Sequence, residues 1–192
     1  MTETVACGAV LGRFQILHND HLAYIMAARK HCGHLVIGIT NPDPRLARPE
    51  QGDGGRTDPR ANPLTYYERQ VMVRGVLEAE GVPLRDFSPV PFPVSFPELY
   101  RYYVPAEAVF YITVYDEWGR MKRGHLQSQG FHTRVLWERP IEHKGISGTD
   151  VRERIRSGKP WEHLVPRAAA DLVRRWNIAD RLSQMNDQPS CV

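Results

Sequence analysis

The stretch GAVLGRFQILHNDHLAYI, from Gly8 to Ile25, passes from an apolar run through a Gly-Arg-Phe turn into an apolar pattern of helical spacing. The apolar run begins at Val5 and ends at Leu11, which is typical of a strand that is buried on both faces. A buried strand that is followed directly by a helix is typical of an α/β protein. We therefore predict this class of fold.

The same order of strand and helix recurs along the chain. Thr65 and Glu68 have the S/T-x-x-E spacing of a capping box, which predicts a helix to about residue 80. The first helix is expected to end at Gly33, and the last ones to begin at Ser147 or Thr149 and near residue 166. Further strands are predicted over residues 34–40, 87–95, 108–114 and 133–137, of which the proline-containing 87–95 fits a sheet edge. The pattern predicts a Rossmann-like, doubly wound parallel sheet of about five strands with a small helical C-terminal extension.

The predicted elements divide the 192 residues into three parts. We expect a nucleotide-binding α/β domain over residues 1–145, a C-terminal helical part over 146–182, and a disordered tail over 183–192. Residues 41–63 are rich in proline, glycine and charge without any period, so they are expected to form a long loop, either a lid or an inert insertion.

The composition is that of an ordinary globular protein, with 42% hydrophobic and 24% charged residues. The formal charge of +3 suits an anionic small substrate. The three cysteines lack the spacing of a metal site, so we expect free thiols in a reducing compartment. No apolar run approaches about 18 residues, and no nucleic-acid-binding motif is found. We expect a cytoplasmic protein with no membrane span and no nucleic-acid partner.

Two histidines stand where the first strand leads into the first helix. Because His18 and His21 are three residues apart, they share one face of a helix start, beside its unpaired N–H groups. Arg13 adds a planar donor fork that matches phosphate oxygens. These donors suit the phosphates of a nucleoside triphosphate. The alternatives are a zinc pair, for which no third ligand is evident, and two unrelated surface histidines.

A second cluster of polar residues lies in GISGTDVRERI, from Gly145 to Ile155. Ser147 and Thr149 lead into a predicted helix, and Arg152 follows one turn later. Hydroxyl groups, a helix N-terminus and a guanidinium again suit an anion. On composition alone, an N-capped helix with a solvated arginine is the alternative.

Together the two stretches resemble the nucleotidylyltransferase superfamily that is marked by H-x-G-H and I-S-x-T-x-x-R. GRFQILHNDH is similar to its G-R-F-Q-P-x-H-x-G-H pattern, and ISGTDVR matches the second motif in full. NPLTYYERQVMV and GKPWEHLVP resemble further segments of the archaeal type of nicotinamide mononucleotide adenylyltransferase. The likeness covers most of the chain.

The resemblance implies a role for each matching residue. His18, His21 and Arg152 would be catalytic, binding the triphosphate and stabilising the transition state. The nucleotide would be bound by Gly12, Arg13, Phe14, Gln15, Ile146, Ser147 and Thr149. Mg²⁺ would arrive with the triphosphate, with few or no protein ligands, and a phosphate of the acceptor would attack the α-phosphorus and expel pyrophosphate.

The chain departs from the family pattern around the acceptor. Asp20 replaces the glycine of H-x-G-H and would repel the phosphates, turn away from them, or contact magnesium or an acceptor amine. Phe96, Tyr100 and Tyr102 lie where archaeal enzymes hold nicotinamide, as stacking partners or as ordinary core and surface aromatics. The resemblance implies an ATP-using adenylyltransferase acting on nicotinamide mononucleotide, as a homo-oligomer. The alternatives are a cytidylyl- or adenylyltransferase for another phosphate or phosphonate, and an inactive nucleotide sensor.

Overall fold

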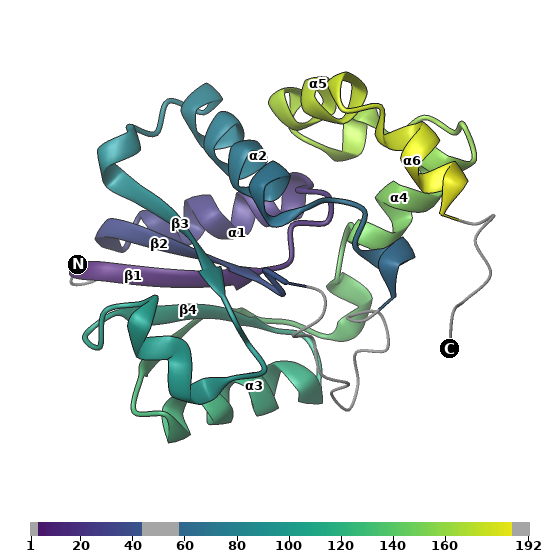
Figure 1. The fold of residues 1–192 in the computed structure, drawn as a ribbon. Coiled ribbons are helices and arrows are strands. Elements are labelled where there is room, and N and C mark those ends of the chain that lie inside the picture. Colours follow the sequence, from purple (N-terminus) through teal and green to yellow (C-terminus); the bar gives the residue numbers. More distant parts are fainter. Residues whose placement is uncertain (1–3, 44–57, 186–192) are drawn as a thin grey trace.

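The structure, a computed structural model, describes residues 4–43 and 58–185. Over these residues it contains a parallel five-stranded sheet of order β3-β2-β1-β4-β5 (Figure 1). The strands are β1 (Val5–Gly12), β2 (Cys32–Thr40), β3 (Phe87–Phe92), β4 (Val109–Val114) and β5 (His132–Glu138). This confirms the predicted doubly wound sheet and the edge position of the proline-containing strand.

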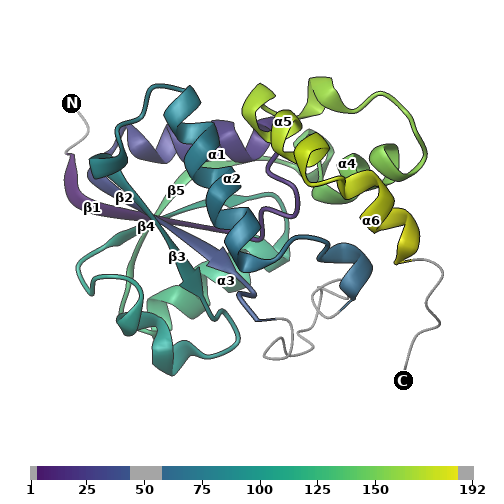
Figure 2. The ribbon, with the colours of Figure 1, turned by 45° about the horizontal axis from the view of Figure 1, so that its top comes forward.

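Helices cover both faces of the sheet. The helices are α1 (Asn19–Arg29), α2 (Tyr66–Ala79), α3 (Glu117–Ser128), α4 (Gly148–Arg156), α5 (Arg167–Arg175) and α6 (Ile178–Gln184). Figure 1 shows α1 and α2 on one face and α3 on the other, while Figure 2 shows α4, α5 and α6 gathered beyond one end of the strands. Since the strand order reverses between β1 and β4, their carboxyl ends form the switch point where such sheets bind ligands.

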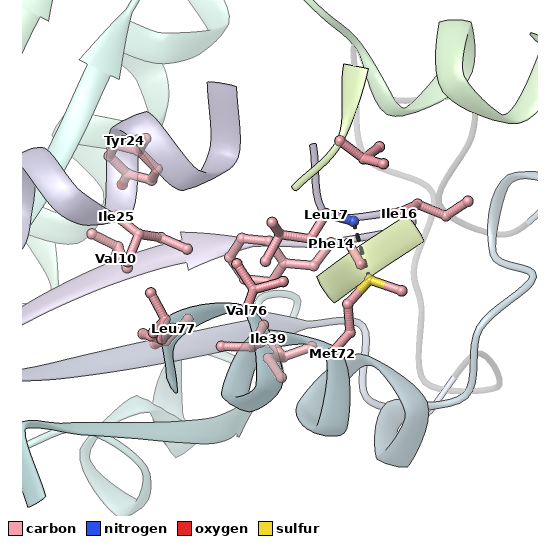
Figure 3. Packing of buried hydrophobic residues seen from close by; sticks show 14 of the residues in the cluster. Val10, Phe14, Ile16, Leu17, Tyr24, Ile25, Ile39, Met72, Val76 and Leu77 are labelled. Atoms are coloured by element: carbon pink, nitrogen blue, oxygen red, sulfur yellow. Dashed lines mark hydrogen bonds between the residues drawn. The ribbon is translucent and has the colours of Figure 1, made fainter. Parts of the chain in front are cut away.

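Alternate residues of β1 enter different parts of the core, which explains its continuous apolar run. Val10 belongs to the hydrophobic cluster beneath α1 and α2, whereas Ala9 and Leu11 belong to the cluster on the opposite face. The turn after β1 continues the first cluster, since Phe14 and Leu17 are buried near Met72 of α2 (Figure 3). The turn that carries the predicted site residues is thus fixed by core packing.

The C-terminal helices share the core of the α/β part. Val151 of α4, Val173 of α5 and Leu182 of α6 are buried in the same cluster as Val10. Arg181 of α6 also forms two hydrogen bonds of 2.8 and 2.9 Å with the Glu68 carboxylate at the start of α2. The predicted division at residue 145 stays a prediction, and the predicted tail falls mostly outside the described residues.

Some predicted boundaries were wrong. α1 ends at Arg29, and Gly33 lies within β2, because β2 begins at Cys32, which pairs with Val5. The helix expected over residues 166–177 is α5, which ends at Arg175 and is followed by the separate helix α6. Asn177, whose φ is 51°, interrupts the helical backbone between α5 and α6. Most of the predicted 41–63 loop lies outside the described residues. In the described part of the chain, no helix has the length and apolar character needed to cross a membrane.

Candidate active site

A pocket of about 730 Å³ lies at the carboxyl ends of β1, β4 and β5. The predicted site residues that line it are Arg13, Phe14, Gln15, His18, His21, Ile146, Ser147, Thr149 and Arg152. The two motifs, more than a hundred residues apart in the sequence, therefore meet at one cavity. Gly12 is not part of this lining, and a Cβ there would lie 2.6 Å from the Phe14 ring, so its small size serves packing.

The imidazoles of His18 and His21 cap the first turn of α1. His18 Nδ1 accepts from the His21 backbone N–H at 3.4 Å, and His21 Nδ1 accepts from the His18 N–H at 3.5 Å. The two rings stack with centroids 3.6 Å apart. Because each Nδ1 is an acceptor, the proton of each neutral ring lies on Nε2. Both rings therefore keep an Nε2–H donor, the group that an anion in the pocket requires.

Burial favours the neutral form of both rings. It lowers the pKa of His18 from 6.5 to about 4, with a smaller opposing effect from the Asp20 carboxylate. Burial also lowers the pKa of His21 well below its usual value, and His18 and Arg13 lower it further. In the structure without ligand, the two histidines are thus uncharged donors at neutral pH.

Arg152 ties the second motif to the first. Its Nη1 donates to the Gln15 carbonyl oxygen, and its Nη2 donates to Thr149 Oγ1 at 3.1 Å. Burial lowers the pKa of Arg152 to about 10, so the guanidinium stays charged at neutral pH. Ser147 is the N-cap of α4, accepting from the Asp150 N–H at 3.1 Å. The predicted cap and the buried cation are both present.

The Gln15 side chain has a structural partner. Its Nε2 donates to the Leu64 carbonyl at 2.9 Å, and its Oε1 accepts from the Leu64 N–H at 2.8 Å. The amide thereby fixes the turn after β1 to the segment before α2. A side-chain contact between Gln15 and the nucleotide stays a prediction.

Arg69 is a site-supporting residue to which the sequence analysis assigned no role. Its buried guanidinium donates to the carbonyl oxygens of Arg13 at 3.0 Å, Thr40 at 2.6 Å and Asn41 at 2.7 Å. It joins the carboxyl ends of β1 and β2 directly behind Arg13. Arg69 Nε donates to a fourth carbonyl oxygen, that of Thr65, at 3.3 Å. A buried cation with carbonyl acceptors leaves no trace in hydrophobic periodicity, and the available signal was its place in NPLTYYERQVMV.

Asp20 lines the pocket beside His18 and His21, and one of its carboxylate oxygens has a backbone partner. Its Oδ2 accepts from the Ile146 N–H at 2.7 Å, which connects the start of α1 to the segment that precedes α4. The roles that the sequence left open for Asp20 toward phosphate, magnesium or an acceptor amine stay predictions. Within the described ranges, no group of three or more His, Cys, Asp or Glu residues has the arrangement of a metal site.

A second wall of the pocket was missed. It is built by Trp137 near the end of β5 and by residues that follow β4 and β5, namely Tyr115, Trp118, Lys122, Arg139 and Lys144. Trp137 Nε1 donates to the Tyr115 hydroxyl at 2.7 Å, and the Arg139 guanidinium lies 5.5 Å from the Trp137 ring centroid. Because parallel strands end at one edge of a sheet, the position of these residues after two predicted strands was the available signal.

The aromatic residues expected at the acceptor do not reach this pocket. Tyr100 is buried in the core and donates to the Val94 carbonyl at 2.5 Å, whereas the Tyr102 side chain is 82% exposed. Phe96 lines a separate small cavity beside Pro93. Of the two roles that the sequence left open, the structure supports ordinary core and surface aromatics over stacking partners, because none of the three lines the pocket of the site.

Comparison with known proteins agrees with this geometry. The family described as cytidylyltransferase-like matches residues 9–154. A phosphonoformate cytidylyltransferase from Streptomyces viridochromogenes is 46% identical over 94% of this chain and 97% of its own length. A nicotinamide-nucleotide adenylyltransferase from Thermococcus kodakarensis is 26% identical over 93% of this chain and 87% of its own.

A solved structure has the same fold. It is a bifunctional NMN adenylyltransferase/ADP ribose pyrophosphatase from Francisella tularensis complexed with AMP and a manganese ion. It superimposes with a TM-score of 0.70 at 15% identity, over 96% of this chain and 53% of the other, so this chain spans about half of its length. The resemblance stated from the sequence is confirmed.

Proposed function

Because the chain belongs to the cytidylyltransferase-like family and is a nucleotidylyltransferase, we propose that it transfers CMP from CTP to a small acceptor carrying a phosphonate or phosphate and a second acidic group. The 46% identity to the phosphonoformate cytidylyltransferase, over nearly the whole of both chains, carries this proposal. The identity to the adenylyltransferase from Thermococcus kodakarensis is 26%. We therefore favour the predicted alternative over ATP and nicotinamide mononucleotide.

The second wall of the pocket supports an anionic acceptor. Three cations line it, Lys122, Arg139 and Lys144, of which Lys144 lies 3.7 Å from the Asp116 carboxylate. Phosphonoformate joins a phosphonate to a carboxylate, so it carries two acidic groups. A wall with more cations than carboxylates favours such a molecule over a neutral one.

The reaction needs no covalent intermediate. An oxygen of the acceptor forms a bond to the α-phosphorus while the bond to pyrophosphate breaks, and the pyrophosphate leaves with that electron pair. In this mechanism the Nε2–H groups of His18 and His21 donate to phosphate oxygens, and Arg13 and Arg152 supply positive charge. When bound, Mg²⁺ or another divalent cation would neutralise part of the triphosphate charge, held by the triphosphate itself.

Pyrophosphate release tests the proposal. The purified protein is assayed with CTP and with ATP, each against phosphonoformate and against nicotinamide mononucleotide. We expect the highest kcat/KM with CTP and phosphonoformate. Faster turnover of ATP with nicotinamide mononucleotide would overturn the choice of substrates, and nucleotide binding without turnover of any acceptor would support the inactive sensor. The homo-oligomer and the cytoplasmic location stay predictions from the sequence.

A further inference from the structure

Asp20 lies between the two histidines of the first motif and contacts the second motif. It is in the first turn of α1, and its Oδ2 accepts from the Ile146 N–H at 2.7 Å. Ile146 directly precedes the α4 cap Ser147, and both residues line the pocket. One carboxylate therefore bridges the two segments that supply the predicted phosphate ligands.

Gly145 is fitted to this contact. A Cβ at Gly145 would collide with Asp20 Oδ2 and would lie 3.3 Å from its Cγ. Among the residues that the structure describes, the glycines with positive φ are Gly81, Gly130 and Gly158, and Gly145 is not one of them. Close approach of the carboxylate, rather than backbone conformation, is thus the requirement that the structure places on this glycine.

We propose that Asp20 is a positioning residue, whose carboxylate holds the Gly145–Ile146 backbone against α1 and so sets the spacing between the His18 and His21 imidazoles and Arg152. The contact also pairs one oxygen of the Asp20 carboxylate with a backbone donor. Arg152 reaches the turn after β1 from the opposite side through the Gln15 carbonyl. The second motif is therefore held to the first at both of its ends.

Two substitutions at Asp20 separate positioning from a role for the charge. Asp20→Ala removes the acceptor of the Ile146 N–H, so we expect the Kd of CTP to rise about tenfold and kcat to fall about tenfold. Asp20→Asn keeps an acceptor oxygen at the same place, so we expect it to retain most of the wild-type KM and kcat. Asn19→Ala is the control from the same turn, since Asn19 Nδ2 donates to the His163 carbonyl at 2.9 Å instead.

Gly145→Ala supplies the second half of the experiment. In the wild-type background its methyl group meets the Asp20 carboxylate, so we expect a loss of CTP binding comparable to that of Asp20→Ala. In an Asp20→Ala background the obstacle is gone, and the double variant should be no worse than Asp20→Ala alone. Hydrogen exchange at the Ile146 amide should accelerate in Asp20→Ala and stay unchanged in Asn19→Ala.

The proposal fails if Asp20→Asn is as damaged as Asp20→Ala, because the charge itself would then be required, as in a metal or amine contact. It also fails if Gly145→Ala is equally harmful in both backgrounds. CTP and ATP binding are measured by calorimetry, without any acceptor. Hydrogen exchange at the Ile146 amide and the stability of the five variants are measured without any ligand, so failure of the substrate assignment would leave this test intact.

Discussion

Replacing His18 by asparagine should change how the stability of the protein depends on pH. Asparagine is a good N-cap residue, so His18→Asn keeps a side-chain acceptor at the start of α1 and removes only the titratable ring. In the wild type, burial lowers the pKa of His18 from 6.5 to about 4. The folded state therefore keeps this ring neutral at a pH where the unfolded chain has already bound the proton.

The direction of the change in stability with pH follows from this difference in pKa between the folded and the unfolded state. As the pH falls from about 6.5 to about 4, the proton binds to the unfolded state only, so the free energy of unfolding falls across this window. At about 1.4 kcal/mol per pKa unit, the full loss is about 3 kcal/mol, of which about 2 kcal/mol arises between pH 7 and pH 5. Below about pH 4 the folded state also binds the proton, and no further loss is due to His18.

Urea unfolding at pH 7 and at pH 5 measures this effect. The wild type should lose about 2 kcal/mol more than His18→Asn between these two conditions, because the other titrating groups are common to both proteins. Equal losses would show that the His18 ring titrates normally in the folded state. A buried ring that serves as an N-cap would then be the wrong description of this site.

Four further substitutions, two of them in the second wall of the pocket, test other parts of the site. Arg152→Lys keeps the positive charge but loses the planar guanidinium that donates both to the Gln15 carbonyl and to the Thr149 hydroxyl. The kcat/KM measured by pyrophosphate release should therefore fall about a hundredfold, and wild-type activity would contradict this role of the guanidinium. Arg69→Met leaves buried carbonyl oxygens without the donors of Arg69, so the free energy of unfolding measured in urea should fall by about 3 to 5 kcal/mol. A loss below about 1 kcal/mol would refute the role of Arg69 in holding the ends of β1 and β2 together. Lys122→Ala and Arg139→Ala should each raise the KM of the acceptor about tenfold without changing the Kd of CTP. Arg120→Ala is the control, because it removes an exposed arginine that is paired with surface carboxylates, and it should change neither constant.

The sequence predicted those parts of the fold and the site that depend on local patterns. The buried run before Gly12, the capping box at Thr65 and the prolines of β3 each determine structure through residues close in the chain. The two motif segments could be joined in advance because each carries several residues of the family pattern. Their meeting at one pocket was predicted from resemblance, and the structure shows the geometry.

What could not be predicted depends on contacts between distant residues. Arg69 and Gln15 are polar side chains in buried positions, and their partners are backbone groups that no residue type identifies. The second wall of the pocket was missed because Trp118 and Trp137 become neighbours of the site only when β4 and β5 are placed in order. The bond from Asp20 to Ile146 likewise crosses 126 positions of sequence.

The imidazole cap of α1 has a consequence for reading related genomes. His18 and His21 satisfy each other's backbone N–H groups, so a descendant that abandoned the reaction would still lose folding stability on mutating either ring to a residue without a side-chain acceptor. Selection for stability would then keep side-chain acceptors at both positions in a pseudoenzyme. Erosion of activity should first become visible at Arg13 or along the cationic wall, where no helix depends on the side chain for its start.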